Sequence, residues 1–487
     1  MADKNALDSL FNPGSIAMIG ATASPRKWGF LIFLNILKAG YTGKLYPVNP
    51  KTESILGFPC HKDVQSIPDP VDLAVITTPA QTVSGLIDAC GKKGIPNVIV
   101  VTADFSETGE EGARMEKEIA GKAHHYGINL VGPNTMGIYS ADSRLHALMP
   151  MIMPLKGSVS MFSQSGNVGV QMLDYGQQEN VGFEKFVSSG NEAVLTVENY
   201  LSYFADDDKT RVILGYLEGV DENSNFVAIA RQVTRKKPVL VMKGGRTAIG
   251  GNAAASHSGA MAGSTAIFKA AFRQSGVIEA KNSQELIDCA KAFASYPLPK
   301  GNRIGIITRG GGWGVLAADA CEENGLSVTP LSEELIRNLD QLLPKYWNRK
   351  NPIDLVATIA FDPLPECLRM LAHWEGVDAV VALGSGFRAF SYQYDESITE
   401  PQELVDAITF MKDVMTEENK KPDETLVEVA NLVKETGKPI ISVSIGSDYA
   451  HKKYSEKYGI VSYPTPERAV RVLRYMVDYG RYLGLSS

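Results

Sequence analysis

The chain has 487 residues, and its 48 Lys and Arg against 55 Asp and Glu give a formal net charge of −7. Its composition, 44% hydrophobic and 21% charged, is ordinary for a globular protein and too apolar for a disordered chain. No basic stripe accompanies this acidic balance, which argues against a nucleic-acid partner. At about 100–200 residues per domain, the length predicts about three domains.

Neither a membrane span nor a secretory leader is predicted. The apolar stretches, such as Val98–Val101 and Ala379–Leu383, are strand-sized, whereas a span needs about 20 apolar residues. The first 20 residues carry Asp3 and Asp8 and lack a long apolar segment. The five cysteines are scattered without a CxxC pair, and no histidine pair has metal-ligand spacing. We therefore expect a cytoplasmic protein that has no disulfides, no membrane partner and no metal site of its own.

The first 150 residues are predicted to alternate short strands with helices. The expected strands are Ser15–Gly20, Lys44–Asn49, Leu73–Thr78, Asn97–Thr102 and Asn129–Gly132. Between the third and fourth of them, apolar residues recur at helical spacing: Val83, Leu86, Ile87 and Cys90. Strands rich in Val and Ile and separated by helices are typical of an α/β domain with a parallel sheet.

Two further sets of strands follow, separated by the stretches Met149–Leu155 and Tyr296–Gly301. The second set is Ser158–Ser163, Phe183–Ser188, Val212–Glu218, Val239–Gly244 and Gly276–Glu279. The third set is Arg303–Thr308, Ala379–Gly384, Pro439–Ile445 and Ile460–Tyr463. We therefore predict three α/β domains with parallel sheets, over residues 1–150, 151–299 and 300–487. The charged run Met411–Glu424 is predicted to be a solvated helix and loop, and the last helix to bury one apolar face made of Val470, Leu473, Met476 and Val477.

The turn after the first predicted strand is a candidate phosphate-binding loop. It reads Gly20-Ala21-Thr22-Ala23-Ser24-Pro25, with Lys27 and Gly29 close behind. Small residues let backbone N–H groups approach phosphate oxygens at the N-terminus of the following helix. The spacing is not GxGxxG, so the dinucleotide fingerprint is absent and a purely structural turn is the alternative. The next two strands end in Asn49-Pro50-Lys51 and Thr77-Thr78-Pro79, and ligands of open α/β sheets bind at such carboxyl ends.

A similar turn opens the second domain, where Ser163-Gln164-Ser165-Gly166-Asn167 follows a strand. Free N–H groups, a hydroxyl and the absence of bulky side chains are typical of an anion site at a helix N-terminus. An ordinary N-cap serine is the alternative.

His257 is the histidine with the most unusual surroundings. It stands in Gly250–Gly263, a segment almost without bulky side chains, whereas a histidine that packs in a core has larger neighbours. Such a loop suits an imidazole that must approach other groups as a nucleophile. Glu218 follows the strand Val212–Leu217, where a carboxylate can hold one ring nitrogen and leave the other free to react. A plain glycine-rich loop and a solvated Glu218 are the alternatives.

Five motifs together resemble the α-type chain of NDP-forming acyl-CoA synthetases, the acetate–CoA ligase (ADP-forming) relatives of succinyl-CoA synthetase. In chain order they are SIAMIGATASP from Ser15, GPNTMG from Gly132, SQSGNVG from Ser163, SSGNEA from Ser188 and ASHSGAMAGS around His257. The His257 segment is the most specific of them, and the glycine turn is the least. The resemblance covers essentially the whole chain. It implies a Rossmann-like CoA-binding domain followed by two succinyl-CoA-synthetase-like flavodoxin domains.

The resemblance further implies an enzyme that is phosphorylated on histidine. In this family acyl-CoA and phosphate give an acyl phosphate, which phosphorylates the histidine, and the phosphoryl group then passes to ADP or GDP. Carried over, His257 is the phosphorylated residue and Glu218 its orienting carboxylate. Ser165 and Gly166 would hold the phosphoryl group, with Asn134 near the thioester. The residues that would line the CoA site are Gly20, Thr22, Lys27, Asn49, Lys51, Thr77, Thr78 and Pro79.

The chain departs from the family pattern in two respects. The family's ATP-grasp domain, either fused or on a β chain, has no counterpart in these 487 residues. The resemblance therefore implies a separate ATP-grasp β subunit, in an α2β2 assembly, that brings ADP/ATP or GDP/GTP and Mg²⁺. The turn after Arg303–Thr308 carries Arg309 and Trp313 where Asn and Pro are expected, which puts the detailed contacts of that turn in doubt.

Two other functions compete with the ligase. A CoA-binding regulatory or structural protein with an inactive ligase-like fold need not keep His257, Glu218 and Ser165 together, so their presence argues against it. A dehydrogenase would need an acidic residue at the end of the second strand to hold a ribose hydroxyl, and the Lys51 context has none.

Overall fold

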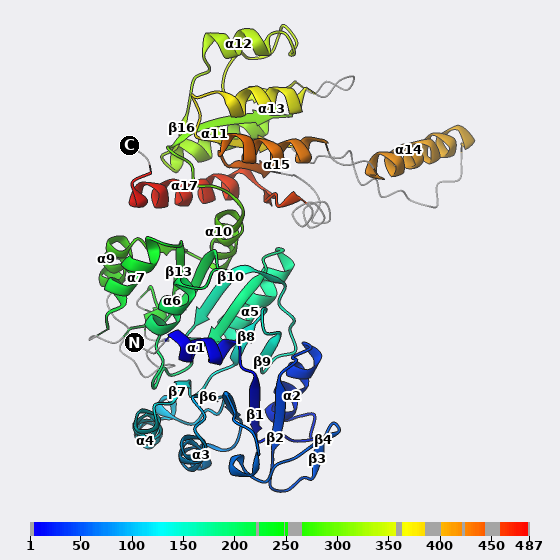
Figure 1. Cartoon of the computed structure of the whole chain (residues 1–487). Coiled ribbons are helices and arrows are strands. Elements are labelled where there is room, and N and C mark those ends of the chain that lie inside the picture. The colour runs from blue at the N-terminus through cyan, green and yellow to red at the C-terminus, as the bar shows by residue number, and fades with distance from the viewer. Residues whose placement is uncertain are drawn as a thin grey trace. The chain divides into compact units, whose positions relative to one another are not determined.

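The computed structural model describes residues 4–220, 224–247, 249–251, 265–356, 363–384, 401–420, 424–443 and 458–485 (Figure 1). The chain divides into two compact units, Met1–Ala294 and Ser295–Ser487. The first unit holds two large sheets and the second holds one. The predicted α/β class with parallel sheets is confirmed, and none of the described helices is long and apolar enough to cross a bilayer.

The first sheet is parallel throughout, in the order β2-β1-β5-β6-β7. Its strands are β1 (Ser15–Ile19), β2 (Lys44–Val48), β5 (Leu73–Ile76), β6 (Asn97–Val100) and β7 (Asn129–Val131). The connecting helices are α2 (Trp28–Lys38), α3 (Ala80–Lys93) and α4 (Glu110–Tyr126). All five strands were predicted, and three of them, β1, β5 and β6, are fully buried, largely apolar runs bounded by turns, which are a strong signal. The chain reverses its direction of winding between β1 and β5, which creates a crevice at the carboxyl ends of these two strands.

The second sheet repeats this winding and adds an antiparallel edge. Its order is β14-β13-β12-β10-β11-β8-β9. The parallel strands are β10 (Lys156–Ser163), β11 (Phe183–Ser188), β12 (Val212–Leu217), β13 (Val239–Lys243) and β14 (Ile278–Glu279). The helices are α5 (Gly166–Gln178), α6 (Val197–Ala205), α7 (Phe226–Thr234), α9 (Thr265–Ser275) and α10 (Ser283–Ser295). Here the winding reverses between β10 and β12, so that the crevice lies after Ser163 and Leu217.

Two short hairpins are absent from the predicted strands. One is β3 (Ser54–Ile55) with β4 (Phe58–Pro59), and the other is β8 (Gly137–Ser140) with β9 (Leu145–Leu148). The strand β8 pairs antiparallel with β11, so a segment inside the predicted first domain completes the second sheet. Residues 1–294 form one compact unit, and the division of the chain into three domains stays a prediction.

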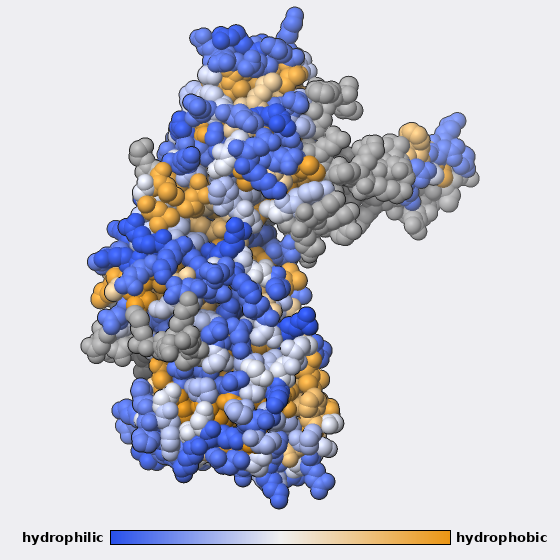
Figure 2. Space-filling view, in the orientation of Figure 1, coloured by the Kyte–Doolittle hydropathy of each residue, from blue (hydrophilic) through white to orange (hydrophobic). Residues whose placement is uncertain are grey.

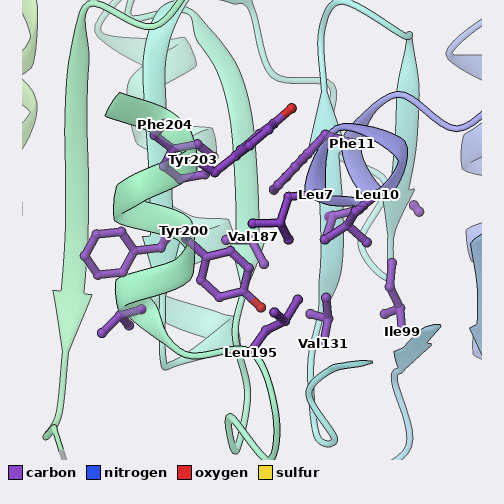
Figure 3. Close-up of a cluster of buried hydrophobic side chains, with 14 of the residues drawn as sticks. Leu7, Leu10, Phe11, Ile99, Val131, Val187, Leu195, Tyr200, Tyr203 and Phe204 are labelled. Carbon is purple, nitrogen blue, oxygen red and sulfur yellow. The ribbon is translucent and has the colours of Figure 1, made fainter. Parts of the chain in front are cut away.

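A shared hydrophobic core joins the two sheets of the first unit (Figure 3). The helix α1 (Lys4–Phe11) contributes Phe11, whose ring stacks on that of Tyr203 from α6 with centroids 5.1 Å apart. Val131 of β7 and Val187 of β11 lie in the same cluster. Burying one such large side chain contributes about 1.5–3 kcal/mol. The core therefore joins the two sheets within one compact unit.

The second unit contains a third sheet with the same winding, in the order β16-β15-β18-β19-β20, with β17 also paired to β15. Its strands are β15 (Arg303–Thr308), β16 (Ser327–Val328), β17 (Ile353–Asp354), β18 (Ala379–Leu383), β19 (Ile440–Val443) and β20 (Ser462–Tyr463). The helices are α11 (Gly311–Glu323), α12 (Glu333–Leu339), α13 (Leu364–His373), α14 (Gln402–Lys420), α15 (Glu424–Thr436) and α17 (Pro466–Leu483). The predicted apolar face of α17 is buried, and the helical part of the charged run is α14.

Candidate active site

Two glycines let the backbone segments around the crevice of the first sheet approach one another closely. Gly20 follows β1 with a φ of +90°, and a Cβ atom there would lie 2.7 Å from Thr77 Oγ1. Gly29, in the first turn of α2, approaches so closely that its Cβ would lie 2.2 Å from the carbonyl oxygen of Gly20. Only glycine fits either position. The first turn of α2 is thereby brought next to the ends of β1 and β5, and a helix N-terminus presents N–H groups to an anion.

Asn49 fixes the turn after β2 to the Gly20 turn. Its Nδ2 donates to Ala21 O at 2.8 Å, and its Oδ1 accepts from the backbone N–H of Lys51 at 2.9 Å. Thr22 accepts at Oγ1 from Ser24 N at 3.3 Å, which shapes the same turn. The Lys51 and Lys27 side chains are exposed beside it. The structure thus brings these predicted residues to one edge of the sheet and leaves two lysines available to an anion.

The threonines after β5 are bonded to the protein itself. Thr77 Oγ1 donates to Ile19 O at 3.2 Å, and Thr78 Oγ1 shares a hydrogen bond of 2.7 Å with Thr82 Oγ1. Pro79 precedes α3 in an extended conformation. The hydroxyl groups of both threonines are therefore engaged within the protein.

A chain of contacts leads from this crevice to the second sheet. Thr102 donates from Oγ1 to Thr78 O at 2.6 Å, and its own carbonyl accepts from Asn134 N at 2.9 Å. Asn134, at a φ of +59°, donates from Nδ2 to Asn191 Oδ1 at 3.2 Å. Two residues on, Met136 packs against the first residue of α5, since a Cβ at Gly166 would lie 2.4 Å from Met136 Cγ. Asn134 is therefore held between the two crevices.

Ser165 and Gly166 begin α5 at the second crevice. Ser165 is the N-cap residue, and its Oγ accepts from Val168 N at 3.5 Å, so the ordinary capping role is present in the structure. That distance is long for a hydrogen bond, and no acidic side chain stands in the first turn of α5. The positive end of the helix dipole is thus left without a carboxylate of its own.

Gln164 ties the Ser165 turn to Glu218 across the crevice. Its Oε1 accepts from the backbone N–H groups of Glu218 at 2.6 Å and of Gly219 at 3.1 Å, and its Nε2 donates to Gly219 O at 2.9 Å. The Gln164 backbone N–H donates to Tyr216 O at 3.2 Å. Glu218 is consequently held at the end of β12, opposite the N-terminus of α5.

Lys243 and Tyr216 support the Glu218 turn from the other side. Lys243 Nζ donates to Glu218 O at 2.8 Å and lies 4.6 Å from the centroid of the Phe268 ring. Burial lowers the pKa of Lys243, while the charge of Glu218 works in the opposite direction. The pKa of Tyr216 is raised to about 12, chiefly by burial and further by the charge of Glu218 and a hydrogen bond to it.

His257 belongs to residues 252–264, which lie outside the described part of the chain. The segment that carries it leaves the second sheet at Lys243, the end of β13, and returns at Thr265 in α9. Its starting point is therefore bonded to the Glu218 turn.

The Arg309 turn of the third sheet occupies the matching position in the second unit. Arg309 N donates to Leu383 O at 3.3 Å, and Thr308 Oγ1 donates to Gly310 O at 2.8 Å. Trp313 is half-buried in the first turn of α11. The two departures from the family pattern thus stand at the crevice of the third sheet.

Two side chains at the second crevice were not assigned a role from the sequence, Gln164 and Glu192. Both stand inside motifs that were recognised, SQSGNVG and SSGNEA, so the signal was present in the chain. What the motifs do not reveal is that β10, β11 and β12 end side by side and bring these residues together.

Two protein-family models match the chain. A CoA-binding domain matches residues 14–141, and a succinyl-CoA ligase-like flavodoxin domain matches residues 156–293. These ranges contain the first and second crevices respectively.

Curated relatives match over nearly the whole chain. The α subunit of acetate–CoA ligase (ADP-forming) II from Pyrococcus furiosus is 36% identical over 482 residues, which is 98% of this chain and 99% of the relative. The α subunit of enzyme I from the same organism is 35% identical and 98% of each chain is covered. The acetate–CoA ligase (ADP-forming) of Methanocaldococcus jannaschii is 35% identical, and the match covers 96% of this chain but 62% of that protein. This chain therefore spans nearly the full length of the two α-subunit relatives. It spans less than two thirds of the longer Methanocaldococcus jannaschii protein.

A solved structure agrees with the fold along the full length. The acetyl-coenzyme A synthetase 1 of Candidatus Korarchaeum cryptofilum, solved with phosphate and ADP, is 34% identical and superposes with a TM-score of 0.85. The match covers 100% of this chain and 98% of that one.

Proposed function

Because this chain belongs to the NDP-forming acyl-CoA synthetases, as one of their α-type chains, we propose that it converts acyl-CoA and phosphate into acid and CoA through phosphorylated His257. Phosphate displaces CoA from the thioester to give an acyl phosphate. The imidazole of His257 then takes the phosphoryl group and releases the carboxylate. Transfer from His257 to ADP or GDP gives the nucleoside triphosphate and restores the histidine.

CoA is proposed to enter the first crevice. The N–H groups of the α2 N-terminus, opened by the small residues of the Gly20 turn, are donors for its phosphates. Lys27 and Lys51 add positive charge at the rim, where they are exposed. The glycines Gly20 and Gly29 keep the turn close to Thr77, which leaves the backbone within reach of a ligand. The remaining proposed CoA-lining residues are Thr22, Asn49, Thr78 and Pro79.

The phosphoryl group is proposed to sit at the second crevice, against Ser165 and Gly166. A helix N-terminus without acidic side chains stabilises a dianion through its N–H groups and dipole. Asn134 stands between this position and the first crevice, where the thioester end of CoA would have to arrive. Glu218 is proposed to accept a hydrogen bond from one nitrogen of His257, which leaves the other nitrogen as the nucleophile.

The observation that carries this proposal is the continuous set of contacts between the two crevices. Thr78, Thr102 and Asn134 connect the CoA-side turn to the loop whose Met136 packs on Gly166. A reaction that passes an acyl group from a thioester to phosphate needs the two sites side by side, since the reacting atoms must approach to about 3 Å.

Nucleotide and Mg²⁺ are proposed to come through a partner. The α-subunit names of the relatives imply a separate subunit, and we propose that it is an ATP-grasp chain in an α2β2 assembly. His257 would then exchange its phosphoryl group with a nucleotide held by that chain. A cytoplasmic location remains the prediction made from the cysteine pattern.

The test is phosphopeptide analysis of the purified chain after incubation with phosphate and a panel of acyl-CoAs. We expect one acid-labile, alkali-stable phosphate on the peptide that carries His257, with the acyl-CoA that supports it identifying the acid. His257→Ala should abolish the modification. If no acyl-CoA phosphorylates the chain, and an ATP-grasp partner with ATP and Mg²⁺ does not do so either, a CoA-binding regulator becomes the better account.

A further inference from the structure

Two turns interlock between the two crevices, and the sequence analysis gave a role to only one of them. The GPNTMG turn, which carries Asn134, follows β7 of the first sheet, and the SSGNEA turn begins at the end of β11 in the second. Asn191 N donates to Pro133 O at 2.9 Å. Gly190 has a φ of +63°, and a Cβ there would lie 2.2 Å from Pro133 O. The backbone of the SSGNEA turn therefore lies directly against the turn that presents Asn134.

The side chain of Asn191 faces two carboxylates of the first sheet's connections. Its Nδ2 donates to Glu107 Oε2 at 2.6 Å and to Glu116 Oε2 at 2.8 Å, and Ser106 Oγ lies 3.1 Å away. Glu107 belongs to the 3-10 helix η2 (Ser106–Thr108), and Glu116 belongs to α4. Glu107 Oε1 accepts from a backbone N–H of the loop before η2 at 2.8 Å, and Glu116 Oε2 accepts from Ser106 Oγ at 2.8 Å. Both carboxylates are thus held in place by the first sheet's own connections.

These two carboxylates decide which way the Asn134 amide faces. An ionised carboxylate only accepts hydrogen bonds, so the Asn191 amide turns its nitrogen toward Glu107 and Glu116 and its oxygen away from them. That oxygen accepts from Asn134 Nδ2 at 3.2 Å, which fixes the nitrogen side of the Asn134 amide toward Asn191. Within the described part of the chain, the Asn134 amide makes no other hydrogen bond. One amide hydrogen and the amide oxygen of Asn134 are therefore left for a ligand, in a fixed orientation.

We propose that Asn191, held by Glu107 and Glu116, is a positioning residue that orients the Asn134 amide for attack of phosphate on the thioester. The inference rests on the proposed function, because Asn134 matters only where the thioester of CoA arrives between the crevices. In this step a phosphate oxygen bonds to the acyl carbon, the C–S bond breaks, and the proton of the phosphate leaves with the CoA thiol. The remaining Asn134 N–H donates to the acyl oxygen as that oxygen gains negative charge. An amide turned the other way would present its own oxygen there.

This role belongs to the first chemical step and leaves the second unaffected. When the acyl phosphate phosphorylates His257, a P–O bond breaks and the acyl carbon stays trigonal, with a carboxylate as a stable leaving group. The second step therefore has no tetrahedral oxyanion for Asn134 to stabilise. Variants of Asn191 should consequently separate the two steps, whereas a general loss of structure would slow both.

The test uses Asn191→Asp in the full chain, with His257 phosphorylation started either from acetyl-CoA and phosphate or from acetyl phosphate. The acyl group is exchanged for the one that the acyl-CoA panel selects. The variant keeps the shape of the side chain but sets a third carboxylate against Glu107 and Glu116. We expect the reaction from acyl-CoA to slow by at least about 10-fold, with the KM for acyl-CoA changed less than about 3-fold. The reaction from acyl phosphate should stay within about 3-fold of the wild type.

A rescue variant tests the hydrogen-bonded chain itself. Adding Glu107→Gln and Glu116→Gln to Asn191→Asp supplies amide donors to the new carboxylate, whose other oxygen can still accept from Asn134. We expect the reaction from acyl-CoA to return to within about 3-fold of the wild type. Glu110→Gln is the matched control, because it removes an exposed carboxylate at the start of α4 and should change neither reaction.

The outcomes separate this inference from the proposed function. If Asn191→Asp changes neither reaction, or slows both equally, the positioning role is overturned while the phosphohistidine mechanism stands. A rescue variant that is still slow from acyl-CoA and fast from acyl phosphate would overturn the part assigned to Glu107 and Glu116. A wild type that is phosphorylated neither from any acyl-CoA nor from the acyl phosphates would count against the proposed function, and the inference would fall with it.

Discussion

The two crevices of the first unit share their topology and differ in their chemistry. In each, the winding of the sheet reverses between its first and third strands, and a small-residue turn leads into a helix. At the first crevice, glycines close on the backbone and the threonine hydroxyls are engaged within the protein. At the second, the side chains of Gln164 and Lys243 bond to the backbone of Glu218, and the charge of Glu218 acts on the pKa of Lys243.

This difference favours ligand binding at the first crevice and group transfer at the second. A crevice built from backbone donors suits a large anionic ligand that has only to be held. A crevice with fixed charges suits a reaction in which a proton and a phosphoryl group move, because preorganised charges need no rearrangement during the step. Substitutions of polar side chains at the second crevice should therefore change the rate of phosphoryl transfer. Substitutions that displace the backbone at the first crevice should change the affinity for CoA.

The largest expected effect follows from Glu218→Gln. The substitution keeps the shape of the side chain and removes the charge proposed to orient the imidazole. We expect the rate of His257 phosphorylation from acyl-CoA and phosphate to fall by about 100-fold, with CoA affinity changed less than about 2-fold. The rate is followed by rapid-quench phosphopeptide analysis, and the affinity by isothermal titration calorimetry. A comparable loss of CoA affinity would contradict the division between the crevices.

Gly29→Ala should produce the reverse pattern. Its Cβ would lie 2.2 Å from the Gly20 carbonyl oxygen, so the first turn of α2 must move away from β1. We expect CoA affinity to fall by about 10-fold or more, since the phosphate donors are displaced. Isothermal titration with CoA measures the change.

The control for this variant is Gly85→Ala in α3. No atom lies within 4 Å of a Cβ built there, so the substitution adds helix propensity without a clash. We expect a stabilisation of about 0.5–1 kcal/mol and unchanged CoA affinity. If Gly29→Ala and Gly85→Ala bind CoA with the same affinity, close packing at Gly29 does not contribute to CoA binding.

The pH dependence of stability provides a smaller effect at the second crevice. The folded state raises the pKa of Glu192 to about 7, so between the ordinary carboxyl value and pH 7 the folded chain binds more protons than the unfolded chain. This contribution to stability is present at acid pH and is lost as the pH rises through about 7. Relative to Glu192→Gln, the wild type should lose about 1–3 kcal/mol between pH 5 and pH 8. Chemical denaturation at each pH measures this difference, and a constant difference would contradict it.

The smallest effect concerns Trp28, at the first position of α2. It is 51% exposed, and hydrophobic residues gather on the surface over this helix (Figure 2). Because helical side chains lean toward the N-terminus of their helix, we expect this ring to lie near the first crevice. We expect CoA to change the tryptophan emission of the wild type but not of Trp28→Phe, because the other three tryptophans lie beyond residue 300. Trp28→Ala should weaken CoA affinity by about 2- to 10-fold.

The elements predicted from the sequence are those whose signal is local. The Val- and Ile-rich strands such as β6 and β12, the helix α3 and the buried face of α17 all follow from periodicity within a few residues. The hairpin of β8 and β9 was missed because its strands, GIYS and LHAL, lack a Val- and Ile-rich run, and the pairing of β8 with β11 is a tertiary choice. A short segment cannot reveal from its own sequence which sheet it joins.

The residues of the candidate site were also found where their signal is local and missed where it depends on tertiary structure. Gly20, Ser165 and Glu218 were found because each follows a predicted strand, and parallel strands end at one edge. That Gln164 and Glu192, 28 positions apart, stand in neighbouring turns depends on β10 and β11 lying side by side, which the sequence does not state. Gln164 also carries no charge, so composition alone does not single it out.

The most direct test of the central claim is a pulse and chase of the phosphoryl group. The chain is labelled with acyl-CoA and radioactive phosphate, freed of small molecules, and mixed with ADP or GDP, Mg²⁺ and the ATP-grasp partner. The account predicts that label on the His257 peptide disappears at the same rate as labelled nucleoside triphosphate forms, and that His257→Ala yields neither. Nucleoside triphosphate formed by the His257→Ala chain, or label that stays on His257 while the nucleotide is made, would contradict it.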